Sequence, residues 1–385
     1  MSQNKFMKFN TKVISGQESW ILRVKNIEAA VTCQAGHLAP VRFRLGRRWV
    51  EPFEVAPWSE EPLPASTLPV QRVMRGDFFC LPFGGNATAY KGEKHLVHGE
   101  TANSRWQMES AGADHLHVSL KTSIRRGRVD KYIRLVPGHT VVYVRHVISQ
   151  MTGPMSFGHH PILKVPAGVI ARVSMSPFLF GQVFPGQLED SAQGGYSILK
   201  SGAKFTSLKR VPRMAGGWAD LSVWPAREGY EDLVQMAADP KCPLAWTALT
   251  VPEERHVWFA LKDPRVLPST VFWMSNGGRH YPPWNGRHRR AIGLEEVLSN
   301  FHYGLAESAK PNAWTRAGVP TCTRLDPQCP LTVNYIMAMA EIPKGFDIVK
   351  SIHPATDRKS VKLISKSGKS VAAKVELSFL SSRQP

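Results

Sequence analysis

Alternation of apolar and polar residues with a period of two is the dominant pattern in this chain. Residues 115–121 (HLHVSLK) alternate strictly, and residues 131–135 and 140–147 form two more alternating runs separated by a Pro-Gly turn. Residues 360–364 and 371–377 form another such pair, separated by a Ser-Gly-Lys turn. Because successive side chains of a strand point to opposite faces, both pairs predict β-hairpins.

Long helical patterns are hard to find, and 30 glycines and 29 prolines interrupt the chain at short intervals. We therefore predict an all-β protein of many strands, arranged as a sandwich with few short helices. The Pro-rich stretch at residues 57–66 is short enough to be a loop, and no internal repeat or low-complexity linker divides the chain. We expect one domain spanning residues 1–385.

Apolar residues make up 43% of the chain, which is enough for a large buried core. No apolar run approaches the roughly 18 residues of a membrane span, and no signal-like segment follows the first residues, so we expect a cytoplasmic protein without a membrane partner. The five cysteines are scattered and lack metal-ligand spacing, so we predict no metal.

The chain carries 49 basic and 30 acidic residues, a formal net charge of +19. An excess of this size is compatible with nucleic acid or with an anionic small substrate. The basic residues are spread over four sections (42–48, 121–134, 279–290 and 344–374) that are interleaved with strand and turn signals. No basic recognition helix emerges, so we interpret most of this charge as solvated surface and expect no nucleic-acid partner.

Candidate acid-base chemistry begins at residues 157–163 (FGHHPIL), where two histidines precede a proline. Proline fixes its own φ and holds the preceding residue extended, so His160 sits in a stiff backbone frame. On an extended chain His159 and His160 point apart, which argues against joint ligation of one metal ion. We expect His160 to face a ligand and His159 to brace the corner, although a purely structural loop histidine fits the same pattern.

Two further segments contain plausible acid-base groups. Residues 75–86 (RGDFFCLPFGGN) are rich in glycine and are followed by His98 on a flexible Gly-containing turn. Residues 291–297 (AIGLEEV) form a short apolar strand that ends in two adjacent carboxylates, Glu295 and Glu296. Strand alternation sends only one of these carboxylates into a cleft, and the residues leave open which one.

These segments together resemble the aldose 1-epimerase (galactose mutarotase) superfamily and are nearest to its hexose-6-phosphate 1-epimerase-like branch. The likeness runs from about residue 20 to residue 307 and is carried by four segments in order, residues 75–84, 98–106, 159–161 and 292–295. It implies a large twisted β-sandwich, with residues 308–385 supplying C-terminal strands that complete the sandwich.

The resemblance also implies a function: cofactor-independent interconversion of the α and β anomers of an aldose. In that family the histidine at the position of His160 is the general acid toward the ring oxygen. The glutamate at the position of Glu295 is the general base on the anomeric hydroxyl, and the two then exchange roles. His98 would bind the ring oxygen or a nearby hydroxyl, and Arg75 would hold hydroxyls or orient Glu295.

The substrate-recognition motif departs from the family pattern. Glu100 and Ala102 stand where the family has an aromatic residue and an arginine, and Arg105 is a nearby replacement. The segment from Trp273 through Arg279 to residue 290 combines aromatic rings with arginines, which is compatible with sugar stacking and an anionic sugar such as a phosphate or uronate. A solvated basic turn beside core tryptophans fits the same residues. We therefore add Arg105, Trp273 and Arg279 to the predicted substrate-binding residues.

A non-catalytic carbohydrate-binding or regulatory protein on the same fold is the alternative to an isomerase. A glycoside hydrolase or polysaccharide lyase would need a second, usually helical, domain for which 385 residues leave no room. In either preferred case we expect a small-molecule carbohydrate partner, no cofactor, and a monomer or homodimer.

Overall fold

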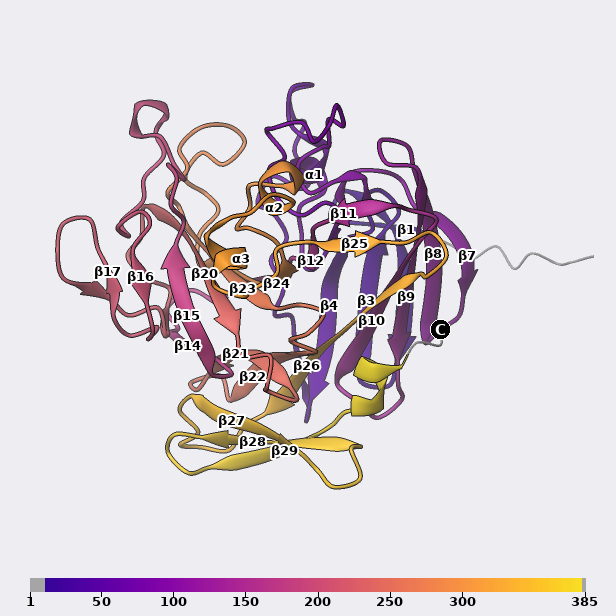
Figure 1. Ribbon diagram of the computed structural model, residues 1–385. Coiled ribbons are helices and arrows are strands. Elements are labelled where there is room, and N and C mark those ends of the chain that lie inside the picture. The colour runs from indigo at the N-terminus through magenta and orange to yellow at the C-terminus, as the bar shows by residue number, and fades with distance from the viewer. Residues whose placement is uncertain (1–10, 383–385) are drawn as a thin grey trace, which may run out of the picture.

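The structure is a computed structural model that describes residues 11–382, and most of its regular structure is β-strand (Figure 1). The all-β prediction is therefore confirmed. The helices are short, as expected: α1 (Pro69–Val73), α2 (Leu305–Ser308) and α3 (Ala313–Arg316), with single 3-10 turns at Glu100–Ala102, Ser191–Gln193 and Leu377–Ser381.

The largest sheet has nine antiparallel strands in the order β19-β14-β21-β22-β26-β10-β9-β8-β7. Its strands are β7 (Gln107–Ala111), β8 (His115–Thr122), β9 (Gly127–Leu135), β10 (Val141–Ser149), β14 (Ala171–Met175), β19 (Val223–Trp224), β21 (Ala245–Val251), β22 (His256–Lys262) and β26 (Leu331–Glu341). The first predicted hairpin is β9–β10, in which Leu135 lies opposite Val142.

The second sheet has eight strands in the order β16-β15-β20-β23-β24-β12-β6, with β13 also paired to β24. Its strands are β6 (Phe79–Cys80), β12 (Phe157–His159), β13 (Ile162–Lys164), β15 (Phe178–Val183), β16 (Lys204–Phe205), β20 (Tyr230–Ala238), β23 (Ser269–Asn276) and β24 (Ala291–Leu298). All three predicted chemical segments contribute to this sheet or to the loops that leave it.

Smaller sheets complete the β structure. The N-terminal strands form a five-stranded antiparallel meander of β1 (Lys12–Ile14), β2 (Gln17–Val24), β3 (Ile27–Thr32), β4 (Leu38–Leu45) and β5 (Arg48–Val50). Two-stranded ribbons pair β11 (Gly153–Met155) with β25 (Thr323–Leu325), and β17 (Val211–Pro212) with β18 (Trp218–Ala219).

The main apolar core lies on one face of the nine-stranded sheet, where the eight-stranded and five-stranded sheets cover it. Its buried side chains include Val144 of the first sheet, Phe272 and Leu294 of the second, and Leu22 of the third. Packing of two sheets through alternate side chains is the usual way in which a β-sandwich buries its inner faces.

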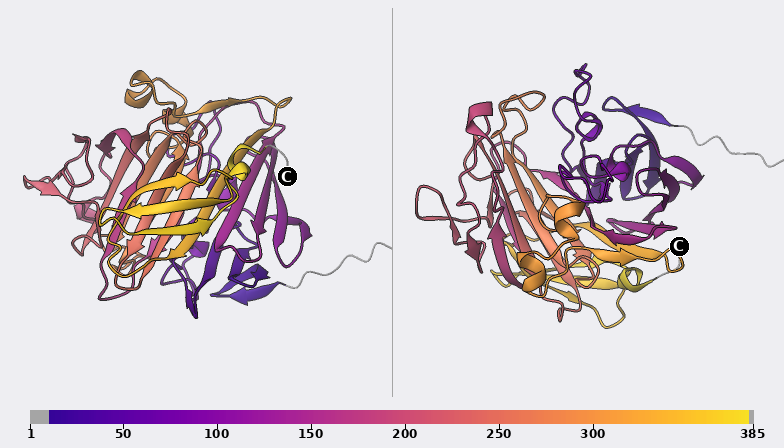
Figure 2. Two further views of the ribbon diagram at one scale, coloured as in Figure 1. Left: turned by 90° about the horizontal axis from the view of Figure 1, so that it is seen from below. Right: turned by 45° about the horizontal axis from the view of Figure 1, so that its top comes forward.

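The last strands do not join either large sheet. β27 (Val349–Pro354), β28 (Ser360–Ser365) and β29 (Ser370–Lys374) form a separate antiparallel sheet that covers the other face of the nine-stranded sheet (Figures 1 and 2). The predicted hairpin at residues 360–377 is β28–β29. Of the predicted C-terminal strands, only β26 lies in a large sheet of the sandwich, between β22 and β10, whereas β25 pairs with β11 in a separate ribbon.

A second apolar cluster lies on the outer face of the eight-stranded sheet. There Leu233, Val271 and Trp273 of the sheet pack against loop residues such as Trp58 and Phe78. Loops and α1 close over this face, and the candidate site lies between them and the sheet. No helix within residues 11–382 has the length and apolar composition to cross a bilayer.

Candidate active site

The His-His-Pro corner joins β12 to β13, and both strands pair with β24. The His160 amide donates to the Phe78 carbonyl at 2.9 Å and to Asp77 Oδ1 at 3.1 Å. On the other side, the Leu294 amide donates to the Pro161 carbonyl at 3.0 Å. Because the backbone is bonded on both sides, the imidazole of His160 is held in one place.

His159 points away from the cleft, as alternation along an extended segment requires. Its Nδ1 lies 2.9 Å from Asp77 Oδ2, and its ring centroid lies 4.4 Å from that of Tyr335 in the core. Asp77 therefore holds both histidines, one through its ring and the other through its backbone amide. His159 thus stabilises the His-His-Pro corner from the core side, as expected.

Glu295 projects from β24 on the same side as His160. Its Oε1 lies 3.2 Å from His160 Nε2, and the residue is only 2% exposed. The two groups lie side by side and in direct contact, and both line the cleft.

Glu296 points to the opposite face of the same strand, into the core between the sheets. Its carboxylate accepts hydrogen bonds from Thr247 Oγ1 at 3.0 Å and Thr270 Oγ1 at 2.7 Å, and it forms an ion pair with Lys262. It has no access to the cleft. The geometry therefore assigns the cleft position to Glu295 and a core position to Glu296.

His98 lies on a strained loop beside this pair. Its φ is 60°, in the left-handed region, and the following Gly99 has φ 74°, where a Cβ would lie 1.9 Å from a carbonyl oxygen. The His98 and His160 ring centroids are 5.0 Å apart. His98 Nδ1 accepts from the Gly84 amide at 3.4 Å, which leaves the proton of the neutral ring on Nε2.

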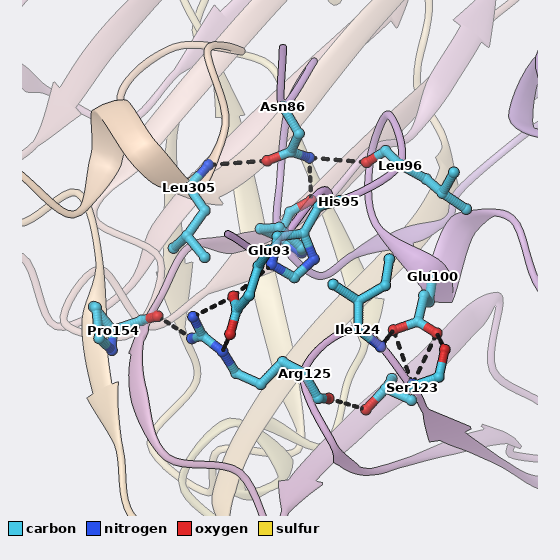
Figure 3. A network of polar contacts seen from close by, with 12 residues as sticks. Asn86, Glu93, His95, Leu96, Glu100, Ser123, Ile124, Arg125, Pro154 and Leu305 are labelled. Atoms are coloured by element: carbon cyan, nitrogen blue, oxygen red, sulfur yellow. Dashed lines mark hydrogen bonds and ion pairs between the residues drawn. The ribbon is translucent and has the colours of Figure 1, made fainter. Parts of the chain in front are cut away.

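Several polar contacts hold the loop that carries His98 (Figure 3). The Asn86 side chain donates to the Leu96 carbonyl and accepts from the Leu305 amide, both at 2.9 Å. Glu93 binds the Arg125 guanidinium through both carboxylate oxygens, at 3.0 and 2.6 Å. These bonds join the loop to α2 and to the β8–β9 turn, and they fix the position of His98.

Glu100 explains one departure from the family pattern. Its carboxylate accepts from the Ser123 amide at 2.9 Å, from the Ser123 hydroxyl at 2.6 Å and from the Ile124 amide at 3.1 Å (Figure 3). It is 9% exposed and does not line the cleft. The acidic residue thus anchors the His98 loop where the family has an aromatic residue.

The cleft is a cavity of about 150 Å³. Five of the seven predicted site residues line it: His98, His160, Trp273, Arg279 and Glu295. The remaining lining residues are mostly apolar: Leu68, Val70, Met74, Phe78, Val97, Leu188, Leu233 and Trp284, with Gln71 and His302 as further polar groups.

Phe78 and His302 are cleft residues that the sequence analysis missed. The Phe78 ring stacks on His160, with centroids 4.4 Å apart and planes 17° apart. Its neighbour Phe79 points the other way and stacks on His146 in the core. Strand-like alternation next to Asp77 was the available signal for Phe78. No sequence motif surrounds His302.

The structure does not bring Arg75 or Arg105 to the cleft. The buried Arg75 guanidinium donates to the carbonyls of Ile14 at 3.0 Å and Ser15 at 2.9 Å, and so ties the β1–β2 turn to the end of α1. Arg105 is on the surface, 2.7 Å from Glu18. Both predicted substrate contacts are therefore corrected to structural ones, because each guanidinium has partners elsewhere.

Arg279 is the basic residue that lines the cleft. Its guanidinium carbon lies 5.4 Å from the ring centroid of Trp273 and 4.5 Å from that of Trp284, and its Nε donates to Glu189 Oε1 at 2.6 Å. Its charge is therefore already balanced by a carboxylate. A guanidinium held between two indole rings is well placed to shape the wall of a site.

The other arginines of this loop point elsewhere. Arg287 pairs with Glu61, Arg289 pairs with Glu228, and Arg290 binds the carbonyls of residues 165 and 169. The arginine cluster that favoured an anionic sugar is therefore dispersed over three separate contacts. Only Arg279 of this group faces the cleft.

Burial dominates the electrostatics of the acid-base pair. It raises the pKa of Glu295 well above its usual value, with the charge of Glu296 as a second cause. Burial lowers the pKa of His160 to about 3 and that of His98 well below its usual value. Both shifts in the pair favour uncharged forms, that is, a protonated Glu295 carboxyl 3.2 Å from the neutral His160 ring, so the pair holds one exchangeable proton between them.

Metal binding finds no support in the part of the chain that the structure describes. Within residues 11–382, no three His, Cys, Asp or Glu side chains gather in an arrangement that would hold a metal ion. The arrangement offers acid-base groups and hydrogen-bond donors set in an apolar wall.

No family model and no curated protein matches this chain. Solved structures do match it. A candidate aldose 1-epimerase from Escherichia coli aligns with a TM-score of 0.58 at 14% identity, covering 85% of this chain and 100% of its own. A candidate aldose 1-epimerase from Klebsiella pneumoniae aligns with a TM-score of 0.59 at 14% identity, covering 86% of this chain and 83% of its own.

A galactose mutarotase related enzyme from Lactobacillus acidophilus gives a TM-score of 0.55 at 11% identity, with 84% of this chain and 97% of its own covered. The chain has the galactose mutarotase-like fold. At these low sequence identities the comparison shows a shared fold only. It does not assign the chain to one branch of the mutarotase-like proteins. The residues that line the cleft carry the argument for function.

Proposed function

We propose that this protein interconverts the α and β anomers of an aldose by acid-base ring opening, with His160 and Glu295 as the catalytic residues. The observation that carries this proposal is the 3.2 Å contact between His160 Nε2 and Glu295 Oε1 inside a cleft that His98 also lines. Anomer exchange needs a proton added at the ring oxygen and removed at the anomeric hydroxyl. These two oxygens share one carbon, so neighbouring groups can serve both.

The shared proton sets the starting state. Passing it from Glu295 to His160 gives an imidazolium beside a carboxylate. His160 then donates to the ring oxygen while Glu295 accepts the proton of the anomeric hydroxyl, and the bond between the anomeric carbon and the ring oxygen breaks. After the open-chain aldehyde rotates, ring closure returns both protons with the roles exchanged.

The surrounding residues support these steps. The Nε2–H of His98 is positioned to donate to a sugar oxygen. The rings of Phe78 and Trp273 have centroids 4.4 and 5.7 Å from that of His160, so they shield the pair from water and offer apolar surface to a sugar ring. A water-poor site strengthens the hydrogen bonds made to the reacting oxygens.

The contacts of the arginines bear on the charge of the sugar substrate. Arg279 is paired with Glu189 and the other loop arginines point elsewhere, so within residues 11–382 no free guanidinium lines the cleft to bind a phosphate. We therefore expect a neutral aldose to be turned over at least as well as its 6-phosphate or uronate. An Arg279→Ala variant should lower turnover of both types alike, because it removes a wall of the site; selective loss of the phosphorylated sugar would contradict this.

Polarimetry of freshly dissolved α-anomers tests the activity itself. The protein should accelerate the approach to anomeric equilibrium in proportion to its concentration for at least one aldose. The panel should contain neutral hexoses and pentoses, their phosphates, and uronates. If none of these equilibrates faster than in buffer alone, the isomerase proposal fails.

A sugar-binding protein without turnover is the second candidate. The observation that favours it is that His160 Nε2 and Glu295 Oε1 already contact each other at 3.2 Å. Such a protein would bind a sugar in calorimetry but leave the rate of anomer exchange unchanged. Calorimetry and polarimetry on the same sugar therefore separate the two candidates.

Gly293 gives a test of the placement of the carboxylate. A Cβ at this position would lie 2.5 Å from Glu295 Oε1 and 3.2 Å from Trp273 Cβ, and the backbone of Gly293 has no positive φ that would exclude alanine. Gly293→Ala should push the carboxylate off His160 and lower kcat by about 10²-fold, the effect of a 1 Å misplacement of a catalytic group. The midpoint of thermal unfolding, measured in parallel, should stay close to that of the wild type, so that the loss of kcat cannot be attributed to unfolding.

The pH dependence of kcat provides a further test. An unperturbed pair would hold one proton only between about pH 4.3 and 6.5. Burial moves the pKa of His160 down and that of Glu295 up, so the one-proton state extends to both sides of this window. We expect kcat, corrected for the uncatalysed reaction, to show no fall between about pH 6 and 7. A decline centred near the ordinary histidine pKa of about 6.5 would contradict the shared-proton state.

A further inference from the structure

A separate cavity of about 340 Å³ lies on the opposite face of the eight-stranded sheet from the cleft. Asp232 and Met274, which are opposite each other on β20 and β23, line it, while their neighbours Leu233 and Trp273 line the cleft. The two cavities share no lining residue. This second cavity, which we call the arginine-tryptophan pocket, is bounded mainly by residues 198–230.

Two guanidinium groups in the arginine-tryptophan pocket have no acidic partner. Arg213 and Arg227 both line it, and neither forms an ion pair with any side chain among residues 11–382. Arg213 Nε is buried and has no hydrogen-bond acceptor within that range. Arg213 is half-buried, whereas Arg227 is exposed. A buried guanidinium nitrogen without an acceptor, with a second unpaired guanidinium in the same cavity, points to an anionic ligand.

A third donor in the same cavity lacks a partner. Trp224 is 2% exposed and lines the pocket, and its Nε1–H donates to no acceptor in the described chain. A buried indole N–H normally finds an acceptor. A bound anion would supply acceptors for donors of this kind in the cavity.

The remaining walls suit a ring. Trp218 lines the pocket and is 53% exposed, an unusual state for a large aromatic side chain. The Arg210 guanidinium stacks on it at 4.8 Å from the ring centroid, and the Arg227 guanidinium lies 5.1 Å from the centroid of Tyr230. A planar apolar group would cover the free surface of Trp218 and extend a stack that is already present.

Two carboxylates also line the pocket, and both are already engaged. Asp220 Oδ1 accepts from the Ser222 amide at 2.9 Å. Asp232 accepts from the amides of Ile198 and Leu199 at 3.2 and 2.9 Å, and burial raises its pKa to about 7. The surrounding segment 198–230 contains six basic and two acidic residues, so its net charge is positive.

We propose that the arginine-tryptophan pocket binds a ring-bearing organic oxyanion, a phosphate monoester or a carboxylate. Arg213, Arg227 and the Trp224 N–H hold the anionic group, and the ring lies against Trp218. The site is independent of the catalytic cleft and of the proposed isomerase activity.

Isothermal titration calorimetry on the full chain tests this proposal with phenyl phosphate and benzoate as the two oxyanion sources. Phenol and inorganic phosphate serve as probes of the ring and the charge alone. We expect phenyl phosphate, benzoate or both to bind at least about tenfold more tightly than phenol or inorganic phosphate. An Arg213→Gln and Arg227→Gln double variant should weaken that binding at least about tenfold, as expected for lost charge-assisted hydrogen bonds.

Matched controls place the binding in this pocket. Arg316→Gln removes an exposed arginine of α3 that also lacks an acidic partner within residues 11–382, and His160→Ala alters only the cleft. Neither change should alter the affinity, and circular dichroism should be unchanged in all variants. Absence of binding by both oxyanions, equal affinity in the double variant, or loss of affinity in either control would overturn the proposal.

Discussion

Replacing Glu295 by glutamine is expected to lower kcat for anomer exchange by about 10²- to 10⁴-fold, the usual contribution of a positioned acid-base group. Glutamine keeps the shape of the side chain and can still hydrogen-bond His160 Nε2, but its amide cannot cycle a proton between the two sugar oxygens. Polarimetric rates at saturating sugar measure this effect. Sugar affinity should change much less, because the cleft walls remain in place.

Stability should not fall in this variant. Glu295 is a buried carboxyl whose raised pKa reports an unfavourable environment for its charge, and a neutral amide removes that cost. A melting temperature close to that of the wild type, combined with lost turnover, would identify the defect as chemical. Substantial residual turnover in Glu295→Gln would exclude this carboxyl as the base.

A double variant sharpens the test. If His160 and Glu295 act as a unit on one shared proton, removing either disables the pair. His160→Ala and Glu295→Gln combined should then reduce kcat little further than either single change. Multiplicative losses would show that the two residues act independently and would contradict a shared proton.

Replacing the neighbouring Glu296 by glutamine should have the opposite outcome. Its carboxylate pairs with Lys262 in the core, where both side chains are at most 2% exposed. Removing one partner of a buried ion pair leaves an unpaired charge and costs about 3–5 kcal/mol in the free energy of unfolding. Lys262 keeps its bonds to the Ser269 carbonyl at 2.8 Å and to Thr270 Oγ1 at 3.0 Å, which only partly compensate.

The loss in Glu296→Gln should depend on pH with a defined sign. Burial lowers the pKa of Lys262, and without Glu296 the opposing attraction is gone. Between the lowered folded-state pKa of Lys262 and the ordinary lysine pKa of about 10.4, the unfolded chain binds a proton more readily than the folded one, so the stability of this variant should rise with pH across that window. Denaturant titrations at several pH values measure this slope, and Glu295→Gln is the adjacent control.

Local features of the chain were predictable because they depend only on neighbouring residues. Period-two alternation gave the β9–β10 and β28–β29 hairpins, since strand geometry fixes which side chains share a face. The same rule sent His159 and His160 to opposite sides. It also showed that only one of two adjacent glutamates would face the cleft, although it did not show which one.

Arginine roles were not predictable in this way. A guanidinium on a long flexible stem takes whichever acceptors the fold brings near, and these are often distant in sequence. Arg75 binds carbonyls about 60 residues earlier in the chain, and Arg287 pairs with Glu61. The loop arginines that suggested an anionic sugar therefore bind other partners, and of this group only Arg279 lines the cleft.

The sequence by itself determined the all-β class, the corner that fixes His160, and the three segments from which the candidate site is built, because backbone stiffness and strand alternation are local properties. Only the tertiary structure decided the contact between His160 and Glu295, the stacking of Phe78, the separate C-terminal sheet and the arginine-tryptophan pocket. These features depend on the register between strands and on the packing of loops far apart in the chain, which local patterns do not specify.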